Sequence, residues 1–147
     1  MNVSVKKSLI KLIGRGLLQA LEYLHSQNIV HADIRPENVL LHKENGSYTV
    51  KLCDFGLSQR IPKGELSVAV PDYYGTASYM APEIKDGCLY LNSDMYSYGV
   101  FLYSMLTGIP QVKPDVELLA WDLIKQCVCG SSTRISATAA LHHAFFD

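Results

Sequence analysis

The stretch HADIRPENVLLHKENGSYTVKLCDFG, His31 to Gly56, contains two polar clusters joined by a segment with the pattern of a β-hairpin. Residues 39–42 and 48–53 are rich in apolar and β-branched side chains, and Asn45-Gly46 lies at the centre of the linker between them. Asn-Gly is the strongest short-range indication of a tight turn between antiparallel strands. Pairing the strands would place Asp54 beside Asn38. On spacing alone, an ordinary hairpin with polar ends remains the simpler interpretation.

The loop that precedes this hairpin carries groups suited to phosphate chemistry. Asp33 can accept a hydroxyl proton, Arg35 is a permanent cation, and Asn38 offers a neutral amide oxygen. Pro36 disfavours the helical region for Arg35, so the segment is expected to be a rigid loop. Asn38 and Asp54 together would supply the oxygen ligands of a sparse Mg²⁺ site that is completed by phosphate and water. A structured turn without chemistry is an equally good interpretation of this loop alone.

The remaining sequence predicts a mainly α fold with small β-hairpins, an α+β domain. Apolar residues at helical spacing predict an amphipathic helix within residues 1–28. Residues 94–107 are apolar on nearly every face, which is typical of a buried helix. Further helices are expected within 116–124 and 136–143. Residues 57–79 have neither helical nor strand periodicity and predict a long surface loop.

Composition limits the classes of partner and the compartment. The chain of 147 residues fits one domain, and its 13 Lys and Arg nearly balance 14 Asp and Glu, so we expect neither nucleic acid nor an anionic membrane as partner. No apolar run reaches the roughly 20 residues of a membrane span, and no secretory signal is recognisable. We therefore expect an intracellular protein, cytoplasmic or nuclear. The four cysteines have no zinc-like spacing and are expected to be reduced, buried thiols.

Three motifs, HADIRPEN, CDFG and GTASYMAPE, occur in this order, and with them the sequence resembles the C-terminal lobe of eukaryotic serine/threonine protein kinases. The resemblance continues through a D-x-Y-S-x-G-V segment to Arg134. It implies that residues 1–147 form a single kinase-like C-lobe. Its parts would be an αE-like helix (1–28), the catalytic loop, hairpin and D-F-G (29–56), the activation segment (57–83) and a helical subdomain with a shortened αG region (84–147).

The resemblance also implies a role for each matching residue. Asp33 would orient the substrate hydroxyl, and Arg35, which replaces the usual lysine, would contact the transferred phosphate. Asn38 and Asp54 would hold Mg²⁺, and Leu40 would form the floor of the adenine pocket for ATP. The activation and substrate loop would include Phe55, Gly56, Gly75 and Thr76. The structural residues would be His31, Asp94, which would hold the catalytic-loop backbone, and Glu83 with Arg134, which would form a buried ion pair.

Two departures from the family pattern bear on activity. Ala32 replaces an arginine that in many members pairs with a phosphorylated activation loop, so phosphorylation there is not expected to act through this position. No G-x-G-x-x-G occurs, and one helix precedes the catalytic loop, so the lid, the strand lysine and the αC glutamate would have to come from an N-lobe in trans or in a longer form.

These observations leave three hypotheses open. The first is an ATP-dependent serine/threonine protein kinase acting on a protein substrate, present here as a truncated catalytic lobe that is weak or inactive alone. The second is a noncatalytic, pseudokinase-like module that binds a protein partner. The third is a small-molecule phosphotransferase, which the A-P-E segment disfavours.

Overall fold

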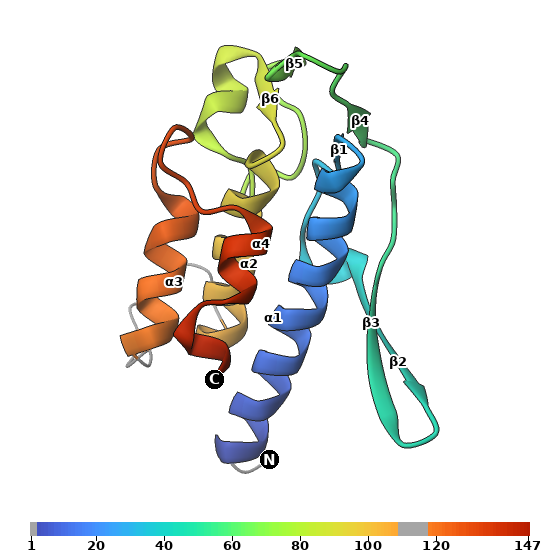
Figure 1. The fold of residues 1–147 in the computed structure, drawn as a ribbon, viewed down its shortest axis with the longest axis vertical. Helices are drawn as coiled ribbons and strands as arrows, with labels where there is room; N and C mark the ends of the chain where they lie inside the picture. The colour runs from blue at the N-terminus through green and yellow to red at the C-terminus, as the bar shows by residue number, and fades with distance from the viewer. Residues whose placement is uncertain (1–2, 109–117) are drawn as a thin grey trace.

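The computed structural model describes residues 3–108 and 118–147 and places helices on one side of a projecting β-hairpin (Figure 1). The helices are α1 (Val3–Ser26), α2 (Ser93–Thr107), α3 (Leu118–Val128) and α4 (Ala137–Leu141). The strands are β1 (Ile29–Val30), β2 (Val39–Glu44), β3 (Ser47–Leu52), β4 (Gln59–Arg60), β5 (Ser67–Ala69) and β6 (Cys88–Tyr90). Short 3₁₀ turns occupy Pro36–Asn38, Pro82–Asp86 and Ala144–Phe146.

The main core lies between α1 and the helices α2, α3 and α4. The apolar positions that predicted the first helix, Ile10, Ile13, Leu17, Leu21 and Leu24, are all buried. The helix expected at 94–107 is confirmed, begins one residue earlier at Ser93, and buries Tyr98 and Phe101 in the same core. The Tyr98 hydroxyl donates to the carbonyl of Gly14 at 3.2 Å. A Cβ at position 14 would lie 3.0 Å from this hydroxyl oxygen, so glycine permits the close approach of α1 and α2.

The two C-terminal helices differ in length from the sequence-based expectation. α3 continues to Val128 because Cys127 is buried against α2, where a Cβ on Gly99 would lie 2.6 Å from the Cys127 Cβ. α4 is shorter than expected and is capped by Ser136, whose Oγ accepts a hydrogen bond from Ala139 N at 3.1 Å. The expected start of α3 at residue 116, and much of the predicted short αG region, lie outside the described residues.

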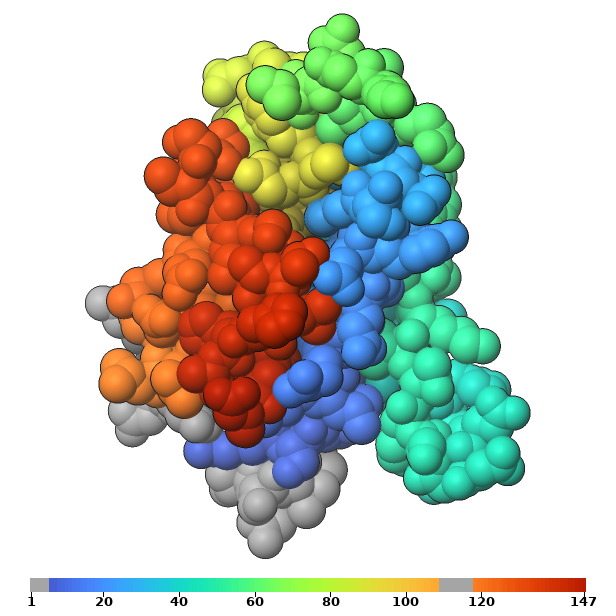
Figure 2. All heavy atoms as spheres, in the orientation of Figure 1, coloured from blue at the N-terminus to red at the C-terminus, as the bar shows by residue number. Residues whose placement is uncertain are grey.

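The predicted hairpin is confirmed. β2 and β3 pair in antiparallel register from Val39↔Leu52 to Glu44↔Ser47. Asn45 and Gly46 form the two-residue turn with φ values of 49° and 81°, the left-handed conformation that this turn requires. The hairpin projects from the helical body (Figures 1 and 2).

The other two sheets correct the expectation that the strands form hairpins. β1 pairs with β4, and β5 pairs with β6, so each sheet joins segments that are distant in sequence. The expected loop at 57–79 is also wrong in part, since it contains β4 and β5. Strands of two or three residues are too short to show an alternation of apolar and polar side chains. Their positions are determined by pairing with strands that are distant in sequence.

The four cysteines are free thiols, but only one fits the expectation of burial. Cys127 is fully buried, and burial raises the pKa of its thiol to about 12. Cys53, Cys88 and Cys129 are partly exposed. Within residues 3–108 and 118–147, no helix has the length and apolar character needed to cross a membrane.

The contact between α1 and the hairpin predicts the effect of substituting Gly16. A Cβ at this position would lie 2.5 Å from the Cγ2 of Val50 on β3. We expect Gly16→Ala to lower the free energy of unfolding in urea by about 1–3 kcal/mol, because β3 must move away from α1.

Helix propensity by itself favours alanine over glycine, so the loss expected at position 16 is the net effect that remains after this gain. Two further variants serve as controls. Gly130→Ala adds a methyl group into open space and should leave stability nearly unchanged. Adding Val50→Ala to Gly16→Ala should recover part of the loss. A Gly16→Ala variant as stable as the parent would show that α1 and β3 are not in close contact.

Candidate active site

The loop before the hairpin is held by the buried carboxylate of Asp94, in the first turn of α2. Asp94 is 1% exposed, its Oδ2 accepts the backbone N–H of His31 at 2.8 Å, and its Oδ1 accepts that of Ala32 at 2.8 Å. Ala32 has a φ of 69°, a left-handed conformation that costs a non-glycine residue about 1–2 kcal/mol. These two hydrogen bonds therefore hold the loop backbone in a conformation that it would otherwise disfavour.

The buried imidazole of His31 connects the loop with the end of the hairpin. Its Nδ1 accepts the backbone N–H of Asp33 at 3.2 Å, and its Nε2 lies 2.9 Å from the carbonyl oxygen of Cys53. A backbone N–H can only donate, so Nδ1 carries no proton and Nε2 must donate to Cys53. The ring of Phe55 packs edge-on against the same imidazole, with centroids 5.0 Å apart. His31 thus links Asp33 to the segment around Asp54.

The side chain of Asp33 accepts hydrogen bonds on both of its oxygens. Thr76 Oγ1 donates to Oδ1 at 2.6 Å, and Asn38 Nδ2 donates to Oδ2 at 3.2 Å and to the Asp33 carbonyl at 2.9 Å. Because the nitrogen of Asn38 points toward Asp33, its amide oxygen is the atom that could bind a metal ion.

Asp54 reaches the neighbourhood of Asn38 through strand pairing. Cys53 N donates to Asn38 O at 2.9 Å, which extends the hairpin ladder by one residue pair. Asp54 is exposed, has a φ of 59°, and accepts the backbone N–H of Gly56 at 3.2 Å. One carboxylate with one amide oxygen fits Mg²⁺, which binds few protein ligands and keeps phosphate oxygens and water. No cluster of three or more His, Cys, Asp or Glu ligands occurs in the described part of the chain, so a closed metal cage does not form there.

Arg35 is bound on both sides by neighbouring groups. Its Nε donates to Glu37 Oε2 at 2.7 Å, and its Nη1 donates to Thr76 Oγ1 at 3.0 Å. The hydrogen bond with Glu37 raises the pKa of Arg35 and lowers that of Glu37 to about 2, so the pair stays charged at neutral pH. The Thr76 hydroxyl therefore lies between the cation of Arg35 and the carboxylate of Asp33.

The remaining predicted loop and pocket residues border this cluster at different places. Gly75 has a φ of 115°, and a Cβ there would lie 2.8 Å from the Ala32 carbonyl, so only glycine fits. Leu40 on β2 and Phe55 are each 49% exposed. Both large apolar side chains are thus about half exposed to solvent.

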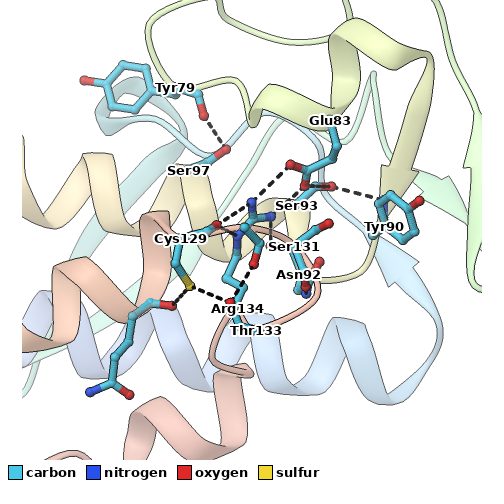
Figure 3. Close-up of polar contacts among 12 residues, drawn as sticks. Tyr79, Glu83, Tyr90, Asn92, Ser93, Ser97, Cys129, Ser131, Thr133 and Arg134 are labelled. Atoms are coloured by element: carbon cyan, nitrogen blue, oxygen red, sulfur yellow. Dashed lines mark hydrogen bonds and ion pairs between the residues drawn. The ribbon is translucent and has the colours of Figure 1, made fainter.

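Glu83 and Arg134 form an ion pair (Figure 3). Arg134 Nη1 and Nη2 donate to Glu83 Oε1 and Oε2 at 2.6 and 3.0 Å, and the Arg134 side chain is completely buried. Ser93, the residue before Asp94, donates to Glu83 Oε1 at 2.9 Å. Burial by itself raises the pKa of Glu83, but hydrogen bonds from Arg134, the backbone and Ser93 outweigh it, so the net pKa is lowered.

Several contacts of the site were not anticipated from the sequence. His25 Nε2 lies 3.0 Å from Asp94 Oδ2, although the two residues are 69 positions apart. The Tyr74 hydroxyl donates to Leu57 O at 2.8 Å, and Gln59 Nε2 donates to that hydroxyl at 2.7 Å. The one available sequence signal was the position of His25 in the last turn of a helix. That position is typical of a helix C-terminus, and it does not identify Asp94 as the partner.

Comparison with known proteins gives a consistent family. The family model described as "Protein kinase domain" matches residues 1–146. A probable myosin light chain kinase of Dictyostelium discoideum is 44% identical over 76% of this chain and 32% of its own length. Calcium-dependent protein kinase 4 of Plasmodium falciparum is 36% identical over 82% of this chain and 22% of its own length. A probable serine/threonine-protein kinase of Dictyostelium discoideum is 43% identical over 67% of this chain and 14% of its own length. The chain thus spans about a third or less of the length of each of these relatives.

The Glu83 contacts predict how stability depends on pH. The folded pKa of this carboxyl is below its ordinary 4.5, so its contribution is complete above that value and is lost as the pH falls through the lower folded value. Glu83→Gln should lower the free energy of unfolding by about 3–5 kcal/mol at neutral pH, because Arg134 stays buried without its anion. The measurement is urea unfolding of parent and variant from roughly pH 6 to roughly pH 3. The difference should narrow at the acidic end, and a difference that does not change with pH would contradict this assignment.

The contacts of His31 predict its tautomer. In ¹⁵N spectra that resolve the ring nitrogens at neutral pH, Nε2 should be protonated and Nδ1 should not, because Nδ1 faces the Asp33 N–H. The solvent-accessible His42, whose side chain is 51% exposed, serves as the internal reference. A protonated Nδ1 on His31 would be incompatible with the hydrogen bond from Asp33.

Proposed function

This chain belongs to the eukaryotic serine/threonine protein kinase family, and we propose that it is the C-terminal lobe of an ATP- and Mg²⁺-dependent kinase that phosphorylates hydroxyl groups of protein substrates. In this proposal residues 1–28 are the αE-like helix, 29–56 carry the catalytic loop and D-F-G, 57–83 are the activation segment, and 84–147 are the helical subdomain. The match of the family model to residues 1–146 supports kinase chemistry in general.

The observation that carries the proposal is the hydroxyl bound to Asp33. The Thr76 Oγ1 donates to this carboxylate at 2.6 Å, within the range for a base that accepts a proton from a reacting hydroxyl. Asp33 is partly exposed, and Asn38 and His31 fix its side chain and backbone from two directions. A serine or threonine hydroxyl of a substrate would be oriented by the same carboxylate.

The donor set also supports a nucleotide with its metal ion. In the proposal the amide oxygen of Asn38 and the carboxylate of Asp54 hold Mg²⁺, which would neutralise charge on the phosphates of ATP. Leu40, exposed on the hairpin, would form the floor of the adenine pocket and contact one face of the adenine ring. Arg35 would face the transferred phosphate, and its planar guanidinium can keep Thr76 and Glu37 bound while a further N–H donates.

Specific contacts also favour a second candidate, a noncatalytic kinase-like module that binds a protein partner. Arg35 is the cation proposed for phosphate, yet Glu37 already neutralises it. Leu40, Leu41 and Phe55 are all at least 41% exposed, and large apolar side chains left exposed can serve as contacts for a partner. An N-lobe bound in trans would cover some of these side chains in either case.

Phosphate transfer from radiolabelled ATP to a generic protein substrate tests the proposal. We expect a weak Mg²⁺-dependent signal from the chain alone and a stronger one after addition of an N-lobe in trans, since the lid and the phosphate-binding lysine align the nucleotide. Asp33→Asn should reduce the rate by about 10²–10⁴-fold, because general-base contributions are of that size.

Controls separate the two candidates. Asp122→Asn changes a carboxylate at the surface of α3 and should leave the rate unchanged. Nucleotide binding without transfer, even with the N-lobe present, would favour the noncatalytic module. A signal that persists in the Asp33→Asn variant would eliminate Asp33 as the base.

A further inference from the structure

We propose that Tyr74 is a positioning residue that holds Gly75 and Thr76 in place by linking them to the start of the activation segment. The catalytic consequence rests on the proposed function, but the link itself can be measured without activity. The Tyr74 hydroxyl donates to Leu57 O at 2.8 Å and accepts a hydrogen bond from Gln59 Nε2 at 2.7 Å. Neither the matched motifs nor the roles predicted from the sequence include Tyr74.

The hydroxyl and the ring of Tyr74 are held by different contacts. The single hydroxyl proton is given to the Leu57 carbonyl, and the oxygen receives the N–H of Gln59, so the hydroxyl both donates and accepts within the chain. The ring is partly buried and packs against a second apolar cluster, whose buried members are Val30, Ile61, Ala81, Ile84 and Leu89. Packing therefore places the ring, and the hydroxyl adds a specific connection to the residues that follow D-F-G.

The residues that Tyr74 contacts are themselves bound to the strand that leads to the catalytic loop. Gln59 is part of β4 and pairs with the fully buried Val30 of β1, the residue before His31. The Ser58 hydroxyl donates to the carbonyl of His31 at 3.2 Å. The hydrogen bonds of Tyr74 therefore connect it to a part of the chain that is fixed relative to the catalytic loop.

The position of Thr76 depends on the chain that precedes it. Its hydroxyl contacts both Asp33 and Arg35, at 2.6 and 3.0 Å. Between Tyr74 and Thr76 lies Gly75, with a φ of 115°, and glycine by itself restricts the backbone little. Without the hydrogen bonds of Tyr74, this short stretch would open more often, and Thr76 would leave its two partners with it.

The link consists of neutral groups, a phenol, an amide and a backbone carbonyl. It therefore needs no phosphate on the activation segment. Position 32 is alanine and offers no cation to such a phosphate. A contact between a phosphate and a basic side chain would instead join opposite charges and would exist only after modification. We infer that the unmodified chain already holds Thr76 in place.

The main experiment compares two tyrosine variants that each remove one hydroxyl. Tyr74→Phe keeps the buried ring and loses the link, whereas Tyr73→Phe changes a neighbour that is 84% exposed. The backbone N–H groups of Ser58 and Tyr79, bonded to Phe55 O at 3.1 Å and to Thr76 O at 2.9 Å, report on the two sides of the link. Residue-resolved hydrogen exchange at both should be roughly 2- to 10-fold faster in Tyr74→Phe, the range for a neutral hydrogen bond. Tyr73→Phe should leave both rates unchanged, as should core amides of α2 in either variant.

A double-mutant cycle tests whether the two side chains act together. Gln59→Leu removes the second hydrogen bond and keeps the backbone pairing of β4, so exchange should become faster by a smaller factor than in Tyr74→Phe. In the Tyr74→Phe background the same substitution should have no further effect, because the hydroxyl that Gln59 contacts is already absent. Effects of the two substitutions that multiply would overturn the link.

Kinetics in the mixture with an N-lobe test the catalytic consequence. Thr76 belongs to the loop that the family resemblance assigns to the protein substrate. Tyr74→Phe should therefore raise KM for the protein substrate, by roughly 2- to 10-fold, and leave KM for ATP unchanged. Tyr73→Phe should change neither value. An equal rise of both KM values in Tyr74→Phe would indicate a general disturbance of the lobe and would overturn the positioning role.

The remaining outcomes separate the link from the proposed function. Equal exchange at Ser58 and Tyr79 in the two tyrosine variants would overturn the inference, whatever the activity. Slow exchange that is lost after phosphatase treatment of the parent chain would also overturn it, because the segment would then depend on a phosphate. Faster exchange with an unchanged KM for the protein substrate in an active mixture would do the same. If no variant transfers phosphate but Tyr74→Phe exchanges faster, the kinase proposal fails and the link stands.

Discussion

The candidate site depends on the need to satisfy one buried charge, the carboxylate of Asp94. An ionised carboxylate that is almost fully removed from water is tolerated in a protein only when hydrogen bonds replace its hydration. The donors that meet this need are the N–H groups of His31, Ala32 and His25. The solvation of a single side chain on α2 therefore fixes a loop that is more than 60 residues away in sequence.

From this anchor, short links extend to each group of the site. The imidazole of His31 connects the Asp33 backbone with Cys53 O, and the pairing of Cys53 with Asn38 closes the hairpin end. Asn38 in turn contacts the Asp33 carboxylate. The geometry of the site thus comes from backbone hydrogen bonds and the buried ring of His31. These contacts position the polar side chains that face solvent.

Those parts of the fold that local sequence determines were predictable. Asn45-Gly46 specified the turn and with it the hairpin register, because few other residues adopt two successive left-handed conformations. The helical spacing in α1 and the all-round apolar surface of α2 were equally informative. The order of the three motifs gave the family, and the matching positions directed attention to Asp33 and its neighbours.

The remaining features depend on contacts between remote segments, for which a single sequence carries no signal. β4 and β5 exist because β1 and β6 lie beside them, and neither strand is long enough to show a pattern. Thr76 reaches Asp33 from 43 residues away, and His25 reaches Asp94 from 69 residues away. Arg35 could be predicted as a cation, but its hydrogen bonds to Glu37 and Thr76 could not be predicted from its type.

Paramagnetic relaxation by Mn²⁺ in the presence of ATP tests the central claim most directly, because Mn²⁺ replaces Mg²⁺ at oxygen sites and broadens only nearby signals. The account predicts that the first signals to broaden at low Mn²⁺ are the side-chain amide of Asn38 and the backbone amides around Asp54, followed by Asp33, with little effect at Asp122 on α3. Broadening that begins elsewhere and leaves Asn38 and Asp54 sharp would contradict a single phosphoryl-transfer centre at the end of the hairpin.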